Sequence, residues 1–87
     1  MIGVRYSKRF VKFAQKLSHK DQERLADQIE LLKENPFHSY LHTKPLSGPF
    51  AGLYSFRITR NFRVLFVFVD PDEIKLIDIG DRKDIYK

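Results

Sequence analysis

The chain has 87 residues, of which 43% are hydrophobic and 31% charged, and its formal net charge is +5 at pH 7. This length allows one domain, residues 1–87, built around a single core. The absence of cysteine excludes disulfides, cysteine-ligated zinc and thiol chemistry. No apolar run approaches about 18 residues and no signal-peptide core is present, so we expect a soluble, cytoplasmic protein that does not enter the membrane.

Basic and acidic residues are separated along the chain. Residues 1–20 carry six basic side chains and no carboxylate, and residues 35–69 carry four basic side chains and no carboxylate. Residues 21–34 and 70–87 are net acidic. Blocks of positive charge without carboxylates favour a polyanion or an acidic protein as partner. A soluble basic protein without such a partner can have the same pattern.

The amino-terminal part of the chain predicts a short strand and two helices. Alternating apolar residues favour a strand over 2–6, and apolar residues at three- and four-residue intervals favour helices over 7–17 and 19–34. Ser7 and Ser18 are suited to cap the two helices. Two helices in direct succession predict a helical hairpin.

The first helix has a basic side. Lys8, Lys12 and Lys16 recur at four-residue intervals beside an apolar stripe that includes Phe10 and Phe13. Such a row is either a solvated face or a docking surface for an acidic partner.

Residues 35–52 are predicted to form one long irregular stretch, because prolines and glycines interrupt it repeatedly. His38 and His42 have the spacing of two metal ligands on a helix, but Pro36 disfavours a helix here. We therefore expect no metal site.

The rest of the chain predicts a meander of three strands over 53–58, 62–69 and 74–80, which the 2–6 strand is expected to join. The middle strand has six consecutive apolar residues after Arg63, which is typical of a strand buried on both faces.

The turn Thr59-Arg60-Asn61 brings two arginines together. If Ile58 pairs with Phe62, Arg57 lies directly opposite Arg63, and like charges so placed need an anion or a carboxylate nearby. Arg63 is therefore expected either to reach water at the strand end or to belong to an anion site.

Three arginines and a lysine would suit the binding and cleavage of a phosphodiester. Guanidinium groups hold the phosphate oxygens and neutralise the negative charge that develops on them in the transition state of cleavage. The sequence offers no Ser-His-Asp grouping and no glycine-rich phosphate loop. The candidates for chemistry are Lys44, Arg57, Arg63, Arg82 and Tyr86.

Four stretches in order carry a family resemblance, namely HTKPLSG at 42–48, GLYSFRI at 52–58, FRVLF at 62–66 and IGDRKDIY at 79–86. With the helical hairpin ahead of them, they make the chain resemble the RelE/ParE superfamily of bacterial and archaeal toxins over nearly its full length. The resemblance implies an α+β fold in which an N-terminal helical hairpin packs on a small antiparallel β-sheet. It also implies a toxin neutralised by an antitoxin that is usually encoded beside it.

The resemblance is to the RelE-like branch, which implies cleavage of messenger RNA in the ribosomal A site without metal or cofactor. There the ribose 2′-hydroxyl attacks the adjacent phosphate and leaves a cyclic phosphate and a 5′-hydroxyl. Arg63 and Arg82 match the family's phosphate-binding arginines and Tyr86 its terminal tyrosine. Arg57 falls where RelE has a strand lysine that helps protonate the leaving oxygen.

The residues expected to contact RNA and the antitoxin are assigned on weaker grounds. Contacts with RNA are expected from Lys44, Arg60 and Lys83, and contacts with the antitoxin from Lys8, Lys12 and Lys16.

The chain departs from the family pattern at two positions. Ser55 stands where RelE has a second lysine, and Asp81 stands where many relatives have a histidine. An arginine is a poor proton donor, so the general acid is unassigned.

Two alternatives stay open. One is a ParE-like toxin that poisons DNA gyrase and lacks the ribonuclease residues. The other is a basic binding module without catalysis, in which Arg82 pairs with Asp78 or Asp84 and Tyr86 packs on the sheet.

Overall fold

The computed structural model describes residues 1–81, so Arg82, Lys83 and Tyr86 lie outside the described residues. The elements in chain order are β1 (Gly3–Tyr6), α1 (Lys8–Lys16), α2 (His19–Glu34), the 3-10 helix η1 (Ser39–Leu41), β2 (Lys44–Pro45), the 3-10 helix η2 (Gly48–Phe50), β3 (Tyr54–Arg57), β4 (Phe62–Asp70) and β5 (Glu73–Asp81). No helix within residues 1–81 is long and apolar enough to cross a membrane.

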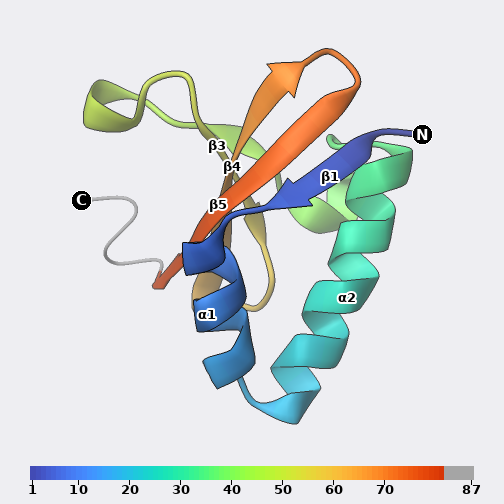
Figure 1. The fold of residues 1–87 in the computed structure, drawn as a ribbon, viewed down its shortest axis with the longest axis vertical. Coiled ribbons are helices and arrows are strands. Elements are labelled where there is room, and N and C mark those ends of the chain that lie inside the picture. Colours follow the sequence, from blue (N-terminus) through green and yellow to red (C-terminus); the bar gives the residue numbers. More distant parts are fainter. Residues whose placement is uncertain (82–87) are drawn as a thin grey trace.

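The five strands form one sheet in the order β1-β5-β4-β3-β2, which confirms the α+β class (Figure 1). β4 lies in the middle and pairs antiparallel with both β3 and β5. The expectation of an antiparallel sheet is wrong at one edge, because β1 runs parallel to β5. The helical hairpin between β1 and the later strands lets the chain return in the same direction, so the sheet is mixed.

Both predicted caps are present. The Ser7 hydroxyl accepts a hydrogen bond from the Phe10 amide at 3.0 Å, and the Ser18 hydroxyl accepts one from the Asp21 amide at 3.1 Å. These side chains satisfy backbone donors that the first turn of a helix leaves open. The caps fix where each helix begins, and Asn35 caps the end of α2.

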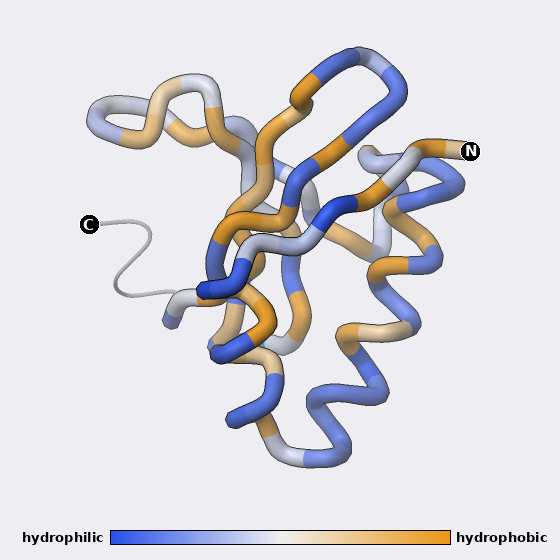
Figure 2. Tube along the Cα trace, in the orientation of Figure 1, coloured by the Kyte–Doolittle hydropathy of each residue, from blue (hydrophilic) through white to orange (hydrophobic). Residues whose placement is uncertain are grey.

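The core lies between the two helices and one face of the sheet. Hydrophobic residues gather along the strands, and hydrophilic residues gather at the α1–α2 connection and at the β4–β5 turn (Figure 2). The buried core residues are Phe10, Leu25, Ile29, Leu32, Leu41, Phe56, Ile58, Val64, Phe66, Ile74, Leu76 and Ile79. Because Phe56, Val64 and Phe66 face the helices, their neighbours along β3 and β4 face away from them.

The burial of two apolar segments differs from expectation. β4 is buried only in its first half, since Val67 and Phe68 are partly exposed and Val69 is 51% exposed. Phe13 of α1 is 41% exposed, although it belongs to the predicted apolar stripe. In the second half of β4, Phe68 is partly covered by the ring of Phe37, whose centre lies 6.2 Å from that of Phe68.

The segment 35–52 is more ordered than predicted, because it contains η1, β2 and η2. Gly48 and Gly52 have φ values of 63° and 94°, which an L side chain rarely adopts, and they allow the tight turns around η2. The resulting loop projects from the sheet on the side away from α2 (Figure 1).

Candidate active site

Two arginines lie side by side on the sheet face turned away from the core, which we call the distal face and define by Ser55, Arg57, Arg63 and Leu65. The Ile58 amide donates to the Phe62 carbonyl at 3.0 Å, and Arg57 pairs directly with Arg63. The predicted register of the β3–β4 hairpin is therefore confirmed.

Arg63 is neither a strand-end residue that reaches water nor a fully open anion site. It is 4% exposed, and its Nη1 donates to the carbonyl oxygens of Thr59 at 2.7 Å, Arg60 at 3.1 Å and Phe62 at 3.2 Å. The guanidinium thus satisfies the carbonyls of the hairpin turn. Hydrogen bonds from a charged group of this kind are worth more than neutral ones.

Arg57, unlike Arg63, has a side-chain donor without an acceptor. Its side chain is half-buried, and its Nε is buried without a hydrogen-bond partner. None of the ion pairs within residues 1–81 includes Arg57 or Arg63. A buried donor that lacks an acceptor costs about 1–3 kcal/mol, and a bound anion would remove that cost. The pair therefore has the electrostatic character of an oxyanion site.

Lys44 joins this face from the edge strand. It is exposed and pairs with Ser55, which is fully buried and pairs in turn with Leu65. Residues opposite one another in an antiparallel ladder share a face. Lys44, Ser55 and Leu65 therefore form one row across the sheet, next to the row of Arg57 and Arg63.

Arg60 lies at the exposed tip of the hairpin turn, beside α2. It borders a hollow of about 480 Å³ that is also lined by Lys20, Arg24 and three carboxylates, Asp21, Glu23 and Asp27. The Arg24 Nε donates to the Ile58 carbonyl at 2.8 Å and holds the hairpin against α2. The surroundings of Arg60 are thus mixed in charge rather than purely basic.

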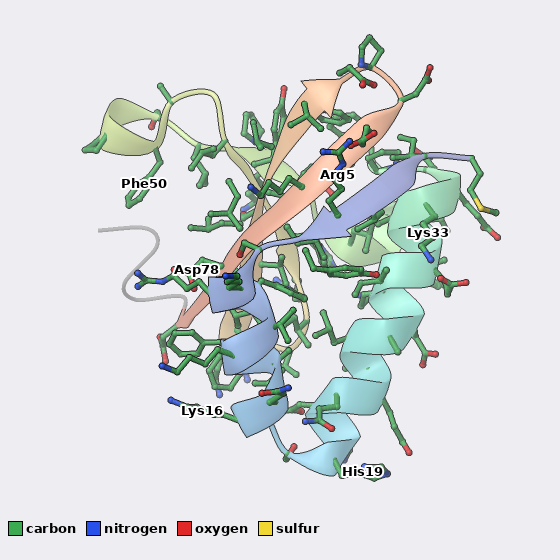
Figure 3. The ribbon with its side chains drawn as sticks, viewed as in Figure 1. Arg5, Lys16, His19, Lys33, Phe50 and Asp78 are labelled. Carbon is green, nitrogen blue, oxygen red and sulfur yellow. The ribbon has the colours of Figure 1, made fainter. Side chains whose placement is uncertain are left out.

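A cavity of about 460 Å³ lies at the end of the distal face, between α1, the η2 loop and β5. Phe50 projects from the η2 loop on the side of Asp78 (Figure 3). The Arg9 Nε pairs with the Asp78 carboxylate at 2.9 Å. The residues that line the cavity are Arg9, Phe13, Phe50, Phe62, Leu65, Asp78, Ile79, Gly80 and Asp81.

This cavity adjoins the arginine pair, because Gly80 is the β5 partner of Arg63 and Asp81 is the partner of Phe62. Arg82, Lys83 and Tyr86 follow Asp81 in sequence and lie outside the described residues. Phe13 and Phe50 were not predicted as site residues. They come from α1 and from η2, and no sequence signal links the two.

The three lysines proposed for the antitoxin, Lys8, Lys12 and Lys16, are all exposed on α1. The Lys16 Nζ lies 5.8 Å from the centre of the Phe13 ring. Beside this row, α1 and α2 enclose an apolar groove of about 430 Å³ whose walls include Tyr6, Val11, Ala14 and Ile29.

His38 and His42 have different surroundings. The His38 Nδ1 accepts a hydrogen bond from the Tyr40 amide at 3.1 Å, and His42 is exposed with a φ of 51°. Within residues 1–81, no group of three or more potential ligands is arranged to hold a metal ion.

The chain matches no protein-family model and no curated protein by sequence. Its structure, by contrast, superimposes on solved toxins. A YoeB/ParE toxin from Agrobacterium tumefaciens has a TM-score of 0.77 at 22% identity, over 93% of this chain and 99% of the other. YafQ from E. coli has a TM-score of 0.75 at 22% identity, over 100% of both chains.

The third comparison is with RelE from Pyrococcus horikoshii, solved as an archaeal RelE–RelB complex. It has a TM-score of 0.76 at 24% identity, over 93% of this chain and 94% of the other. The chain has the RelE/ParE toxin fold. In that fold, the five-stranded sheet with its helical hairpin places the β3–β4 arginine pair and the start of the carboxyl-terminal tail at one end of the molecule.

Proposed function

We propose that this protein is the toxin of a type II toxin–antitoxin system and that it cleaves messenger RNA on the ribosome. The observation that carries the proposal is the Arg57–Arg63 pair on the distal face, which has no carboxylate partner within residues 1–81 and leaves a buried donor open. The likeness of the fold to YoeB/ParE, YafQ and RelE supports it.

The arginine pair suits the chemistry of RNA self-cleavage. Attack of the 2′-hydroxyl on the adjacent phosphorus places extra negative charge on the non-bridging oxygens. Preorganised guanidinium groups stabilise that charge more than they stabilise the ground state. In this proposal Arg57 contacts the phosphate, and Arg63 holds the hairpin that positions Arg57 and adds its charge to the site. Arg82 and Tyr86 complete the site from the tail, and no metal or cofactor takes part.

The neighbouring surfaces suit an RNA strand. Lys44, Arg60 and Lys83 are proposed to contact the backbone, and the aromatic rings of Phe13 and Phe50 offer stacking surfaces for a base. Cleavage in this manner yields a 2′,3′-cyclic phosphate and a 5′-hydroxyl.

An antitoxin is the proposed protein partner. RelE of Pyrococcus horikoshii, YafQ of E. coli and YoeB of Staphylococcus aureus were each solved in complex with another protein, RelB, DinJ and YefM respectively. The lysine row of α1 and the adjoining apolar groove offer an acidic amphipathic helix both charge and apolar contacts.

A non-catalytic binding module with the same fold is the second candidate, and one observation favours it. Arg63 is buried and already donates three hydrogen bonds to the hairpin turn, so its role here is structural. Such a module needs the arginine for folding only.

The test is expression of the protein without its antitoxin, followed by purification and incubation with ribosomes that carry a defined message. We expect growth arrest, loss of translation and cuts within codons whose new ends bear a 5′-hydroxyl. DNA damage with translation intact would instead support a gyrase-poisoning toxin. Normal growth with folded protein present would support the binding module.

A further inference from the structure

The edge strand β2 fixes one lysine next to the arginine pair. Lys44 pairs with Ser55 of β3, and the Leu46 amide donates to the Leu53 carbonyl at 2.9 Å just beyond it. On the other side of Lys44, the Thr43 hydroxyl donates to the Pro36 carbonyl at 2.5 Å. Anchors on both sides hold the backbone of Lys44 against β3, while its side chain stays exposed.

The register also sets the direction of the side chain. Lys44 shares the distal face with Ser55, and Arg57 is the next residue of β3 on that face. Diagonal neighbours across an antiparallel pair have Cα atoms about 7–8 Å apart, within the reach of long side chains. The lysine ammonium can therefore meet the same phosphate as Arg57.

RNA cleavage by the 2′-hydroxyl needs a proton for the departing 5′-oxygen. Arg57 and Arg63 carry guanidinium groups, which do not release a proton at any relevant pH. Asp78 is a carboxylate in an ion pair with Arg9 and cannot donate one in that form. Lys75 is on the same face, but it pairs with Val67, four residues along β4 from Arg63 and hence about 13 Å away.

We propose that Lys44 is the general acid of the cleavage reaction. This inference rests on the proposed function. The 2′-oxygen forms a bond to phosphorus and its proton passes to solvent, while the bond from phosphorus to the 5′-oxygen breaks. The Lys44 Nζ gives one proton to that oxygen, which leaves as a 5′-hydroxyl, and the resulting neutral amine regains a proton from water.

The sharpest test replaces the 5′-bridging oxygen of the scissile phosphate by sulfur. A thiolate leaves without a proton, because thiols ionise near a pKa of about 8.5. On the ordinary message, we expect Lys44→Ala and Lys44→Gln to slow single-turnover cleavage by about 10²–10⁴-fold, the range typical of a general acid. On the sulfur-containing message, both variants should cleave within about tenfold of the wild type, since the acid has no role there.

Lys44→Arg separates proton donation from charge. It keeps a positive side chain that cannot donate, so we expect it to be slow on the oxygen message and to be rescued by sulfur, like Lys44→Ala. The matched control is Lys75→Ala, an exposed strand lysine of the same face, which should cleave both messages at the wild-type rate. Thermal unfolding of each variant should match the wild type.

Several results would overturn the inference. Equal losses on both messages would show that Lys44 only binds the phosphate, and full activity of Lys44→Arg on the oxygen message would show that charge alone is needed. Normal cleavage by Lys44→Ala would remove Lys44 from the chemistry while leaving the proposed function intact. If the wild-type protein cleaves neither message, the proposed function fails as well.

Discussion

Arg57 and Arg63 face each other across the β3–β4 hairpin, yet only Arg63 uses its guanidinium to hold the hairpin turn. Arg63 Nη1 donates to three carbonyls of the turn, whereas Arg57 Nε is buried without a partner. This difference predicts that Arg63 contributes mainly to the stability of the fold and that Arg57 contributes mainly to activity.

Arg57→Met is expected to leave the fold intact and remove activity. The substitution eliminates a like-charge neighbour and a buried unpartnered donor, so the free energy of unfolding should stay constant or rise by about 0.5–1 kcal/mol. Single-turnover cleavage should fall by about 10²–10³-fold, as when an oxyanion donor is lost. Urea unfolding and cleavage are measured on the same preparation. A destabilised Arg57→Met variant that cleaves normally would refute this division.

Arg63→Ala is expected to destabilise the protein by about 2–3 kcal/mol, because it removes the hydrogen bonds from a buried guanidinium to the carbonyls of the hairpin turn. Its cleavage should therefore be assayed well below its unfolding temperature. The matched control is Arg60→Ala, an exposed arginine two residues before the strand, whose unfolding temperature should equal that of the wild type. An Arg63→Ala variant as stable as the wild type would contradict the role assigned to these hydrogen bonds.

Arg82→Ala and Tyr86→Phe are each expected to reduce cleavage by about 10²–10³-fold while ribosome binding and thermal unfolding stay unchanged. Contacts made in the transition state affect turnover more than affinity. A phosphate contact used only for binding would instead weaken affinity and its dependence on salt. Cleavage at near-normal rates by both variants would remove these two residues from the site.

Association with the antitoxin should slow as the salt concentration rises, because exposed charges steer the encounter and salt screens them. Replacing Lys8, Lys12 and Lys16 by alanine should lower the association rate and flatten its salt dependence. Lys75→Ala is the control, since it removes one exposed lysine from a strand elsewhere. An antitoxin footprint confined to the acidic side of α2 would contradict the proposed surface.

Local sequence signals predicted the elements whose partners are close in the chain. The serine caps, both helices and the β3–β4 register follow from hydrogen bonds and side-chain periods that span a few residues. The parallel pairing of β1 with β5 joins residues about 70 positions apart, and nothing in either strand specifies its direction. β2 was not predicted, because it has only two residues and one of them is a proline.

The candidate site was predicted by residue type rather than by geometry. The pairing of Arg57 with Arg63 was expected, but the burial of Arg63 was not, because it depends on hydrogen bonds to three carbonyls that come together only once the hairpin turn has formed. The position of Lys44 became clear only with the register of β2. Sequence alone could therefore list the charged groups but could not say which of them lie close together on one face of the sheet.

The parallel edge of the sheet also bears on the order in which the strands can come together. β5 is the partner of both β1 and β4, and the Ser7 hydroxyl donates to the Ile77 carbonyl at 2.5 Å. The first strand therefore has no place to dock until residues 73–81 have been synthesised. Pairing over so long a separation also slows folding. A nascent chain can therefore form the β3–β4 hairpin, and with it the Arg57–Arg63 pair, before the sheet is complete, but β1 is added only after residues 73–81 have been made.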